Sequence, residues 1–315
     1  MQLTEICRSL GVTSWRPVRP WRIELSGVGI RESKNAIERT LVWETAAGTL
    51  TSRWTLGPDG DWWQSEYPVK RSTDLRAARM VAEARKYELG TWPGHEVPAQ
   101  ASSDEIPAVQ LPQRPWSELF HTFLGWSEGL VLFLEEPDAL RDVVKILEEK
   151  LARLVAEIMR LPGSTVVSPD NLDGQFIAPA AFEEMLAPSY RKSVEMLRAC
   201  GKRLVVHVGG PVRRLLPGLA DCGIDCVEGV CGPPQGDSPL AEARGLSGAR
   251  MALWGGIPQD SLLASFPESG FREAAEAAFS MARADPGVIV GVADRVPVSA
   301  LPERLEALAR MSLEM

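Results

Sequence analysis

Several features that would place this 315-residue chain in a common class are scarce or missing. It has no run of about 18 apolar residues, the length that a membrane-spanning helix needs. Its start, MQLTEICRSLG, lacks the basic and apolar segments of a secretory signal. With a net charge of −8 it also lacks the basic balance that nucleic-acid binding requires. We therefore expect a cytoplasmic protein that has neither a membrane nor nucleic acid as its partner.

Cysteine, histidine and glycine-rich motifs are limited as well. The five cysteines are an odd number without the spacing of a small disulfide scaffold, so we expect reduced thiols. No predicted strand is followed by the glycine-rich fingerprint of a dinucleotide or P-loop site. The chain has only three histidines. What is abundant is apolar residues, 45% of the chain against 24% charged, which indicates a globular protein with a sizeable core.

The pattern of apolar and polar residues changes along the chain. The stretch RTLVWETAAGTLTSRWTL has strand formers on both sides of residues 46–48 and predicts a hairpin. The stretch DALRDVVKILEEKLARLVAEIMRL has apolar residues at helical spacing on one face. We expect residues 1–70 to form an N-terminal segment with a β-hairpin extension and residues 71–315 to form the main fold, within one structural domain overall.

From about residue 165 onward, predicted strands and helices alternate with short connections. This order predicts parallel strands with right-handed crossovers. Both a (β/α)₈ barrel and a doubly wound sheet fit it.

The ends of five predicted strands carry polar residues or glycines. They are Asp170 and Asp173, His207, Glu228 and Cys231, Gly255 and Gly256, and Asp294. In a barrel the carboxyl ends of the strands share one rim, where catalytic residues gather. This concentration predicts an active site at that rim.

His207 ends the buried strand of RLVVHVGG, and three interpretations are open for it. The first is a structural residue that is hydrogen-bonded to a backbone carbonyl, the second is a proton donor, and the third is a metal ligand. For a metal, Cys231 ends the next strand, and Glu228 or Asp237 could complete a zinc site of three protein ligands. The spacing of these residues matches no short zinc motif.

Most of the remaining candidate residues have two interpretations each. Asp170 and Asp173 supply paired carboxylates for acid–base work or for a cation, or else they serve turns. Arg213, beside Arg214, clamps a carboxylate or phosphate, or else lies on a solvated helix face. Gly255 and Gly256 let a ligand or a neighbouring backbone come close. Asp237 and Asp294 are candidates for substrate binding.

Long stretches of the chain resemble the uroporphyrinogen decarboxylase superfamily. The resemblance rests on LEEPDALRDVVKILEEK, on SPDNLDGQFIAPAAFEEMLAPSYRKSVEMLRACGKRLVVHVGG, and on CVEGVCGPPQGDSPLAEARGLSGARMALWGGIPQD with GVADRVPVSALPERL. TLVWETAAGTLTSRW and YPVKRSTDL are similar to the N-terminal part of its members. The resemblance runs from about Trp43 to the end and implies a TIM-like (β/α)₈ barrel, here with a shortened or altered first barrel unit.

The superfamily implies two chemistries, and the chain departs from the pattern of each. Uroporphyrinogen decarboxylation uses an arginine-rich loop near the N-terminus that this chain lacks. Methyl transfer from a corrinoid protein to a thiol uses zinc held by His-x-Cys and a later cysteine. Here Gly209 stands at that cysteine position, and GVADRVP has no cysteine, so only His207 transfers.

We therefore expect a methyltransferase-like enzyme that moves a methyl group from a corrinoid or a small methylated substrate to a thiol-type acceptor. The alternative is a cofactor-free decarboxylase of a carboxylate substrate, with Asp170 as acid and Arg213 holding the carboxylate. The third is an inactive barrel that binds a ligand or a corrinoid protein. The resemblance also allows a zinc ion and a homodimer.

Overall fold

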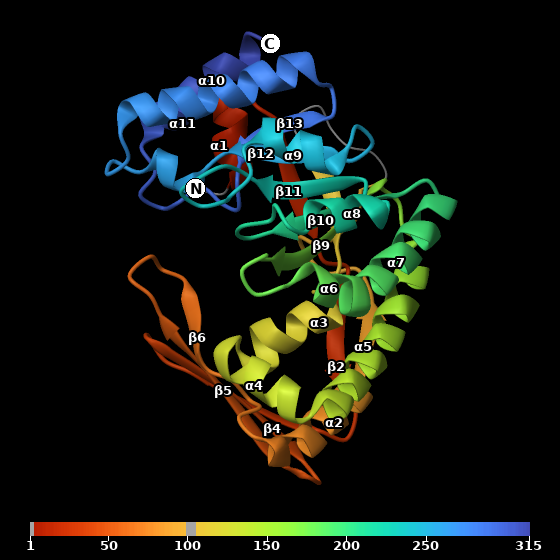
Figure 1. Ribbon diagram of the computed structural model, residues 1–315. Helices are drawn as coiled ribbons and strands as arrows, with labels where there is room; N and C mark the ends of the chain where they lie inside the picture. Colours follow the sequence, from red (N-terminus) through yellow and green to blue (C-terminus); the bar gives the residue numbers. More distant parts are fainter. Residues whose placement is uncertain (1–2, 99–104) are drawn as a thin grey trace. The chain divides into compact units, whose positions relative to one another are not determined.

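The computed structural model describes residues 3–98 and 105–315, which fall into two compact units (Figure 1). The barrel unit consists of Met1–Pro20, Trp92–Pro112 and Ile158–Met315, and the insert unit of Trp21–Thr91 and Gln113–Glu157. This division differs from a boundary at residue 70, because the first strand of the chain pairs within the same sheet as the C-terminal half.

A seven-stranded parallel sheet forms the centre of the barrel unit. Its strands are, in order across the sheet, β1 (Ser14–Val18), β8 (Glu105–Gln110), β9 (Thr165–Leu172), β10 (Arg203–Val208), β11 (Cys226–Val230), β12 (Ala252–Ile257) and β13 (Val288–Val292). No eighth strand joins this sheet within the described ranges, so the eight strands expected of a closed barrel are corrected to seven. The connections β1–β8 and β8–β9 run through the insert unit instead of through single crossover helices.

The sheet curls around an apolar interior. Four strands lie between β1, which carries Trp15, and β12, which carries Trp254, yet the centroids of the two rings are 5.1 Å apart. Both pack against a buried layer of one residue from each of four neighbouring strands, namely Ala108, Val167, Val205 and Cys226. The fold is therefore the TIM-like α/β type, with side chains filling its interior in layers.

Helices alternate with the strands of the barrel unit. They are α1 (Leu3–Leu10), α6 (Pro179–Ala181), the π-helical turn η3 (Phe182–Leu186), α7 (Ala187–Ala199), α8 (Leu216–Asp221), α9 (Leu240–Ser247), the 3₁₀ turn η4 (Gln259–Leu262), α10 (Glu268–Ala284) and α11 (Pro302–Leu313). The buried residues of α7 and α10 recur at intervals of three and four, as the helical period requires. The alternation predicted from residue 165 onward is confirmed.

Two antiparallel sheets belong to the insert unit. One contains β3 (Gly29–Lys34), β4 (Glu38–Thr45), β5 (Gly48–Leu56) and β6 (Trp62–Glu66), and the other pairs β2 (Trp21–Leu25) with β7 (Arg85–Leu89). β4 and β5 pair through a tight turn between Thr45 and Gly48. The sequence predicts a hairpin at this place.

The insert unit also contains the longest helix of the described chain. Its helical segments are η1 (Ser72–Asp74), α2 (Leu75–Ala84), α3 (Pro115–Glu118), η2 (Leu119–Leu124), α4 (Ser127–Glu135) and α5 (Pro137–Ile158). The predicted long helix is confirmed by α5, which is 22 residues long. No helix among the described residues is long and apolar enough to span a membrane.

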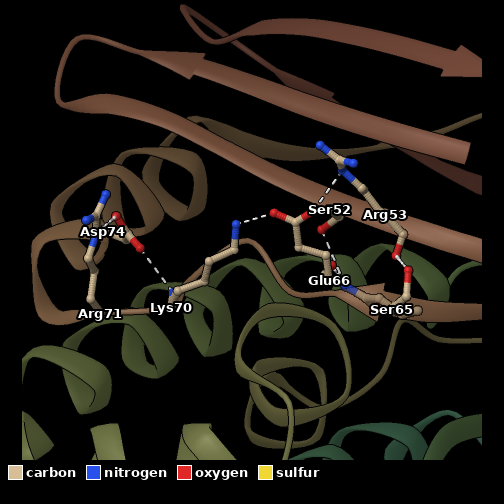
Figure 2. A network of polar contacts seen from close by, with 8 residues as sticks. Ser52, Arg53, Ser65, Glu66, Lys70, Arg71 and Asp74 are labelled. Carbon is tan, nitrogen blue, oxygen red and sulfur yellow. Dashed lines mark hydrogen bonds and ion pairs between the residues drawn. The ribbon is translucent and has the colours of Figure 1, made fainter.

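Charged side chains join the elements of the insert unit. Arg85 donates from Nη1 to both carboxylate oxygens of Glu118, at 2.7 and 2.8 Å, where both side chains are largely buried. Near the surface, Glu66 bridges Arg53 and Lys70 (Figure 2). Exposed pairs such as the latter contribute little to stability, whereas loss of one partner of the buried pair would leave an uncompensated charge.

Candidate active site

His207 lies at the carboxyl end of β10, one layer above the apolar interior. It follows Val205 by two residues, and alternate residues of a strand face the same side. Its imidazole therefore points to the inner side of the curled sheet, and its side chain keeps 17% of its surface exposed. This is the rim where the sequence predicts the active site.

Glu228 holds the Nδ1 side of the imidazole. β10 and β11 pair in parallel with His207 opposite Glu228, and Nδ1 lies 2.5 Å from Oε2. Glu228 is buried, with 6% of its side chain exposed. On the other side of the ring, Nε2 lies 3.6 Å from Oδ1 of Asp294, a residue with φ of 67° just after β13. Carboxylates therefore flank both nitrogens.

These carboxylates affect the pKa of the ring. Burial disfavours the imidazolium, but the hydrogen bond to Glu228 and the negative charges of Glu228, Asp294 and Asp170 outweigh that effect and raise the pKa of His207. The protonated ring donates Nδ1–H to Glu228, and Nε2–H lies on the more open side, beside the partly exposed Asp294. A buried carboxylate that orients a histidine in this way is a common arrangement for proton transfer.

Asp170 is fully buried and bound by a tyrosine. Its Oδ2 accepts a hydrogen bond of 2.5 Å from the hydroxyl of Tyr190, which comes from α7 and is also fully buried. Asp170 lies in an irregular part of β9, since the pairs Ser168–Val206 and Leu172–Val208 enclose three residues of β9 but only one of β10. Because its carboxylate has no exposed surface, Asp170 acts on the site through its charge.

Asp173 and Asp237 each place an oxygen on the backbone of a rim loop. Asp173 Oδ1 accepts from the backbone N–H of Gln175 at 2.7 Å. Asp237 Oδ1 accepts from the N–H groups of Val212 and Arg213 at 2.8 and 3.0 Å. These bonds are turn chemistry of the kind that the alternative interpretation of Asp173 expects. Asp237 ties the loop after β11 to the loop after β10.

Arg213 and the two glycines serve packing and surface pairing. The guanidinium of Arg213 binds Glu242 at 2.5 Å, with 55% of its side chain exposed. A Cβ on Gly255 would lie 2.1 Å from the carbonyl oxygen of Val230, and one on Gly256 would lie within 2.8 Å of side chains on α9 and α10. The glycines therefore allow neighbouring protein groups to come close, which is one of their two interpretations.

The predicted metal ligands do not meet as a set. Within residues 3–98 and 105–315, no three or more His, Cys, Asp or Glu side chains are grouped so as to hold a metal ion. Cys231 is buried, and that burial raises the pKa of its thiol to about 12, although an N–H of Gly236 opposes the rise. His207, Cys231 and Glu228 therefore do not fit a zinc ion in this arrangement.

Sequence reasoning missed Tyr190 and Gly229. Tyr190 lies in the first turn of α7, two residues after Pro188, where its ring predicts only core packing. Gly229 forms a bulge in β11, with φ of 98° and no room for a Cβ, which would lie 2.2 Å from the carbonyl oxygen of Val208. The bulge turns the chain just after Glu228, as bulges near active sites often do.

Comparison with known proteins identifies one matching family and several solved structures with a similar fold. A model of the family "Uroporphyrinogen decarboxylase (URO-D)" matches residues 117–314. Among solved structures, a methyltransferase from Methanosarcina mazei superposes with a TM-score of 0.54 at 13% identity, covering 81% of this chain and 72% of that one. A D-psicose 3-epimerase from Clostridium cellulolyticum H10 gives a TM-score of 0.38 at 14% identity over 67% and 77%. A comparison with curated protein sequences gave no match.

Proposed function

This chain belongs to the uroporphyrinogen decarboxylase family, and we propose that it is a methyltransferase-like enzyme within it. The reaction moves a methyl group from a small methylated substrate, or from a corrinoid carried by a partner protein, to a thiol. His207 moves the proton that accompanies this transfer. The observation that carries the proposal is the imidazole of His207 held at Nδ1 by Glu228, with Nε2 on the more open side.

The proton balance of this reaction suits one histidine. In a transfer from R–X–CH₃ to R′–SH, the carbon–X bond breaks and a carbon–sulfur bond forms, giving R–XH and R′–S–CH₃. The thiol loses a proton. The leaving atom X of a neutral donor gains one, whereas a sulfonium, ammonium or methylcorrinoid donor leaves without one, and the thiol proton then passes to solvent. The Nε2 atom of His207 can receive the thiol proton and deliver one to the leaving atom of a neutral donor, while Glu228 keeps the ring oriented.

The charges near His207 favour a neutral or cationic methyl donor. Glu228, Asp294 and Asp170 all act on the ring as negative charges. At about 4 Å, a further negative charge would be repelled by about 1 kcal/mol or more per pair. Arg213, the predicted clamp for a substrate carboxylate, is engaged with Glu242 at the surface. A carboxylate substrate therefore lacks the partner that the decarboxylase reading assigned to it.

Zinc is the cofactor that family methyltransferases would use to activate a thiol. Because the residues available here do not fit it, no step of the proposed reaction runs through a metal. Deprotonation of the thiol is assigned to the neutral form of His207. Once it has accepted that proton, the ring protonates the leaving atom of a neutral donor, or returns the proton to solvent when the donor is cationic or a methylcorrinoid.

The test is direct detection of the product. The protein is incubated with dithiothreitol and, separately, with methylcobalamin, a trialkylsulfonium salt or a tetraalkylammonium salt, and S-methyl thioether is measured by mass spectrometry. We expect thioether with at least one donor and a large loss in His207→Gln. Arg213→Gln is the matched control, because its side chain pairs with Glu242 at the surface. Absence of thioether with every donor would contradict the proposal.

A second candidate is decarboxylation without a cofactor. It is favoured by the imidazolium of His207, which can protonate the carbon left after carbon dioxide departs, a role that the buried Asp170 cannot perform directly. Release of labelled carbon dioxide from a panel of small carboxylic acids tests it. Ligand binding without either product would instead support a barrel that only binds.

A further inference from the structure

We propose that Tyr190 is a positioning residue for the active site, which acts on His207 by fixing the carboxylate of Asp170. The inference rests on the proposed function, since it takes His207 as the group that moves the proton. It adds a residue on an outer helix, with no exposed surface of its own, to those that set the geometry of the site.

Packing in the core fixes the ring of Tyr190 independently of the hydrogen bond that its hydroxyl donates to Asp170. Tyr190 follows Pro188 in the first turn of α7, and its ring stacks on Phe182 with centroids 5.9 Å apart and 23° between the planes. Both residues are buried. Because the ring is packed in the core, the place of its hydroxyl oxygen is fixed. That oxygen lies 2.5 Å from Oδ2 of Asp170.

Asp170 needs such a partner because of the backbone it lies on. In a regular strand the pleat decides which way a side chain points. Opposite His207, however, β9 has the three residues Pro169, Asp170 and Asn171, and Asn171 has φ of 51°. The pleat is lost at this point. The hydrogen bond from Tyr190 is a contact that holds the carboxylate in its position there.

The same irregular segment brings Asp170 to His207. His207 is the single residue of β10 opposite three residues of β9, of which Asp170 is the middle one. The charge of Asp170 acts on the imidazole together with the charges of Glu228 and Asp294. A hydroxyl on α7 is therefore connected to the proton-transfer atom through one carboxylate, and loss of the hydroxyl removes one of the contacts that hold that carboxylate in place.

A purely structural role would have different consequences. If the Tyr190–Asp170 bond only joined α7 to β9, its removal would lower stability and leave the imidazole of His207 as it is. The decisive readout is therefore the NMR spectrum of the His207 side chain at one pH, assigned by its loss in His207→Asn. This readout needs no substrate.

The test compares Tyr190→Phe with Tyr87→Phe, which removes another buried hydroxyl, in the insert unit, where it binds Arg85. We expect the ring signals of His207 to shift in Tyr190→Phe and to stay unchanged in Tyr87→Phe. With a substrate identified, kcat should fall about 10- to 100-fold, the effect of losing one hydrogen bond to a charged group, with KM nearly constant. Unchanged His207 signals in Tyr190→Phe would overturn the proposal.

Asp170→Asn provides a second variant in case Tyr190→Phe does not fold. It keeps an acceptor for the tyrosine and removes the charge, so the His207 signals should shift again, and their constancy would also overturn the proposal. The two proposals fail separately. Shifted His207 signals without thioether from the wild type leave Tyr190 as a positioning residue and reject methyl transfer. Thioether formation by the wild type, together with unchanged His207 signals in the variants, would support methyl transfer and reject Tyr190 as a positioning residue.

Discussion

His207 and Glu228 lie opposite each other on neighbouring parallel strands, and Nδ1 of the imidazole is 2.5 Å from Oε2 of the carboxylate. The backbone register fixes the pair, and the apolar layer two residues below it excludes water from one side. The pair therefore places a largely buried ring beside a buried carboxylate, which raises the pKa of the imidazole. The following predictions depend on this pair and on its surroundings.

The raised pKa of His207 couples the charge of this ring to the stability of the fold. Because the pKa is higher in the folded protein than in the unfolded chain, the stabilising contribution is complete below the ordinary value of about 6.5 and is lost as the pH rises through the folded value. Denaturant titrations of wild type and His207→Gln from acidic to alkaline pH should show an advantage of the wild type that shrinks with rising pH. An advantage that grows with pH would contradict this assignment.

Gly229 provides a prediction about the bulge that follows Glu228. Alanine there would need φ of 98° and would place Cβ 2.2 Å from the backbone oxygen of Val208, so Gly229→Ala should lower the free energy of unfolding by about 2 kcal/mol or more. The matched control is Gly245→Ala in α9, where a Cβ meets nothing within 4 Å. That change should raise the free energy of unfolding by up to about 1 kcal/mol. Equal effects of the two changes would disprove the strained geometry at Gly229.

The part of this site that can be predicted from the sequence is the part that depends on where the strands end. His207, Glu228 and Asp294 were identified because each comes at or just after the end of a β-rich run, and parallel strands bring such ends to one rim. That Glu228 binds the imidazole, and does not join it around a metal, depends on the one-residue register between β10 and β11. The extra residues of β9 depend on tertiary packing, so neither Asp170's burial nor its bond to Tyr190 could be predicted.

The N-terminal half shows a different limit. β1 has the sequence SWRPV, in which an arginine and a proline obscure the strand pattern. Its partner β8 begins 87 residues after the end of β1, beyond most of the insert unit. Local patterns identify the hairpin of β4 and β5 but do not show that the chain returns to the barrel unit between its two excursions. Long-range pairing is the information that a single sequence does not provide.

The cysteines allow a test of the rim that requires no substrate. Cys200 is exposed, whereas Cys231 is buried with a thiol pKa raised to about 12, so its thiolate is scarce near neutral pH. Iodoacetamide should label Cys200 in the native protein and Cys231 only after unfolding, as judged by peptide mass spectrometry. Labelling of Cys231 as fast as Cys200 would show a reactive thiol at the rim.

Metal content tests the exclusion of zinc from the proposed reaction. Because the described residues bring no three suitable ligands together, we expect the zinc bound per chain to be the same in wild type, His207→Ala and Cys231→Ala. Elemental analysis after dialysis against a weak chelator measures it. One zinc per chain in the wild type that is lost in both variants would restore a His/Cys site and reject the metal-free proton transfer.

The most direct measurement is the pH titration of the His207 ring by NMR, in wild type, Glu228→Gln and the surface control Glu242→Gln. The wild type should titrate above the ordinary value of about 6.5. Glu228→Gln should titrate at lower pH, because burial persists while the charge opposite Nδ1 is removed, and Glu242→Gln should match the wild type. A wild-type pKa at or below 6.5, or no change in Glu228→Gln, would contradict an imidazolium held by Glu228 as the proton carrier of this enzyme.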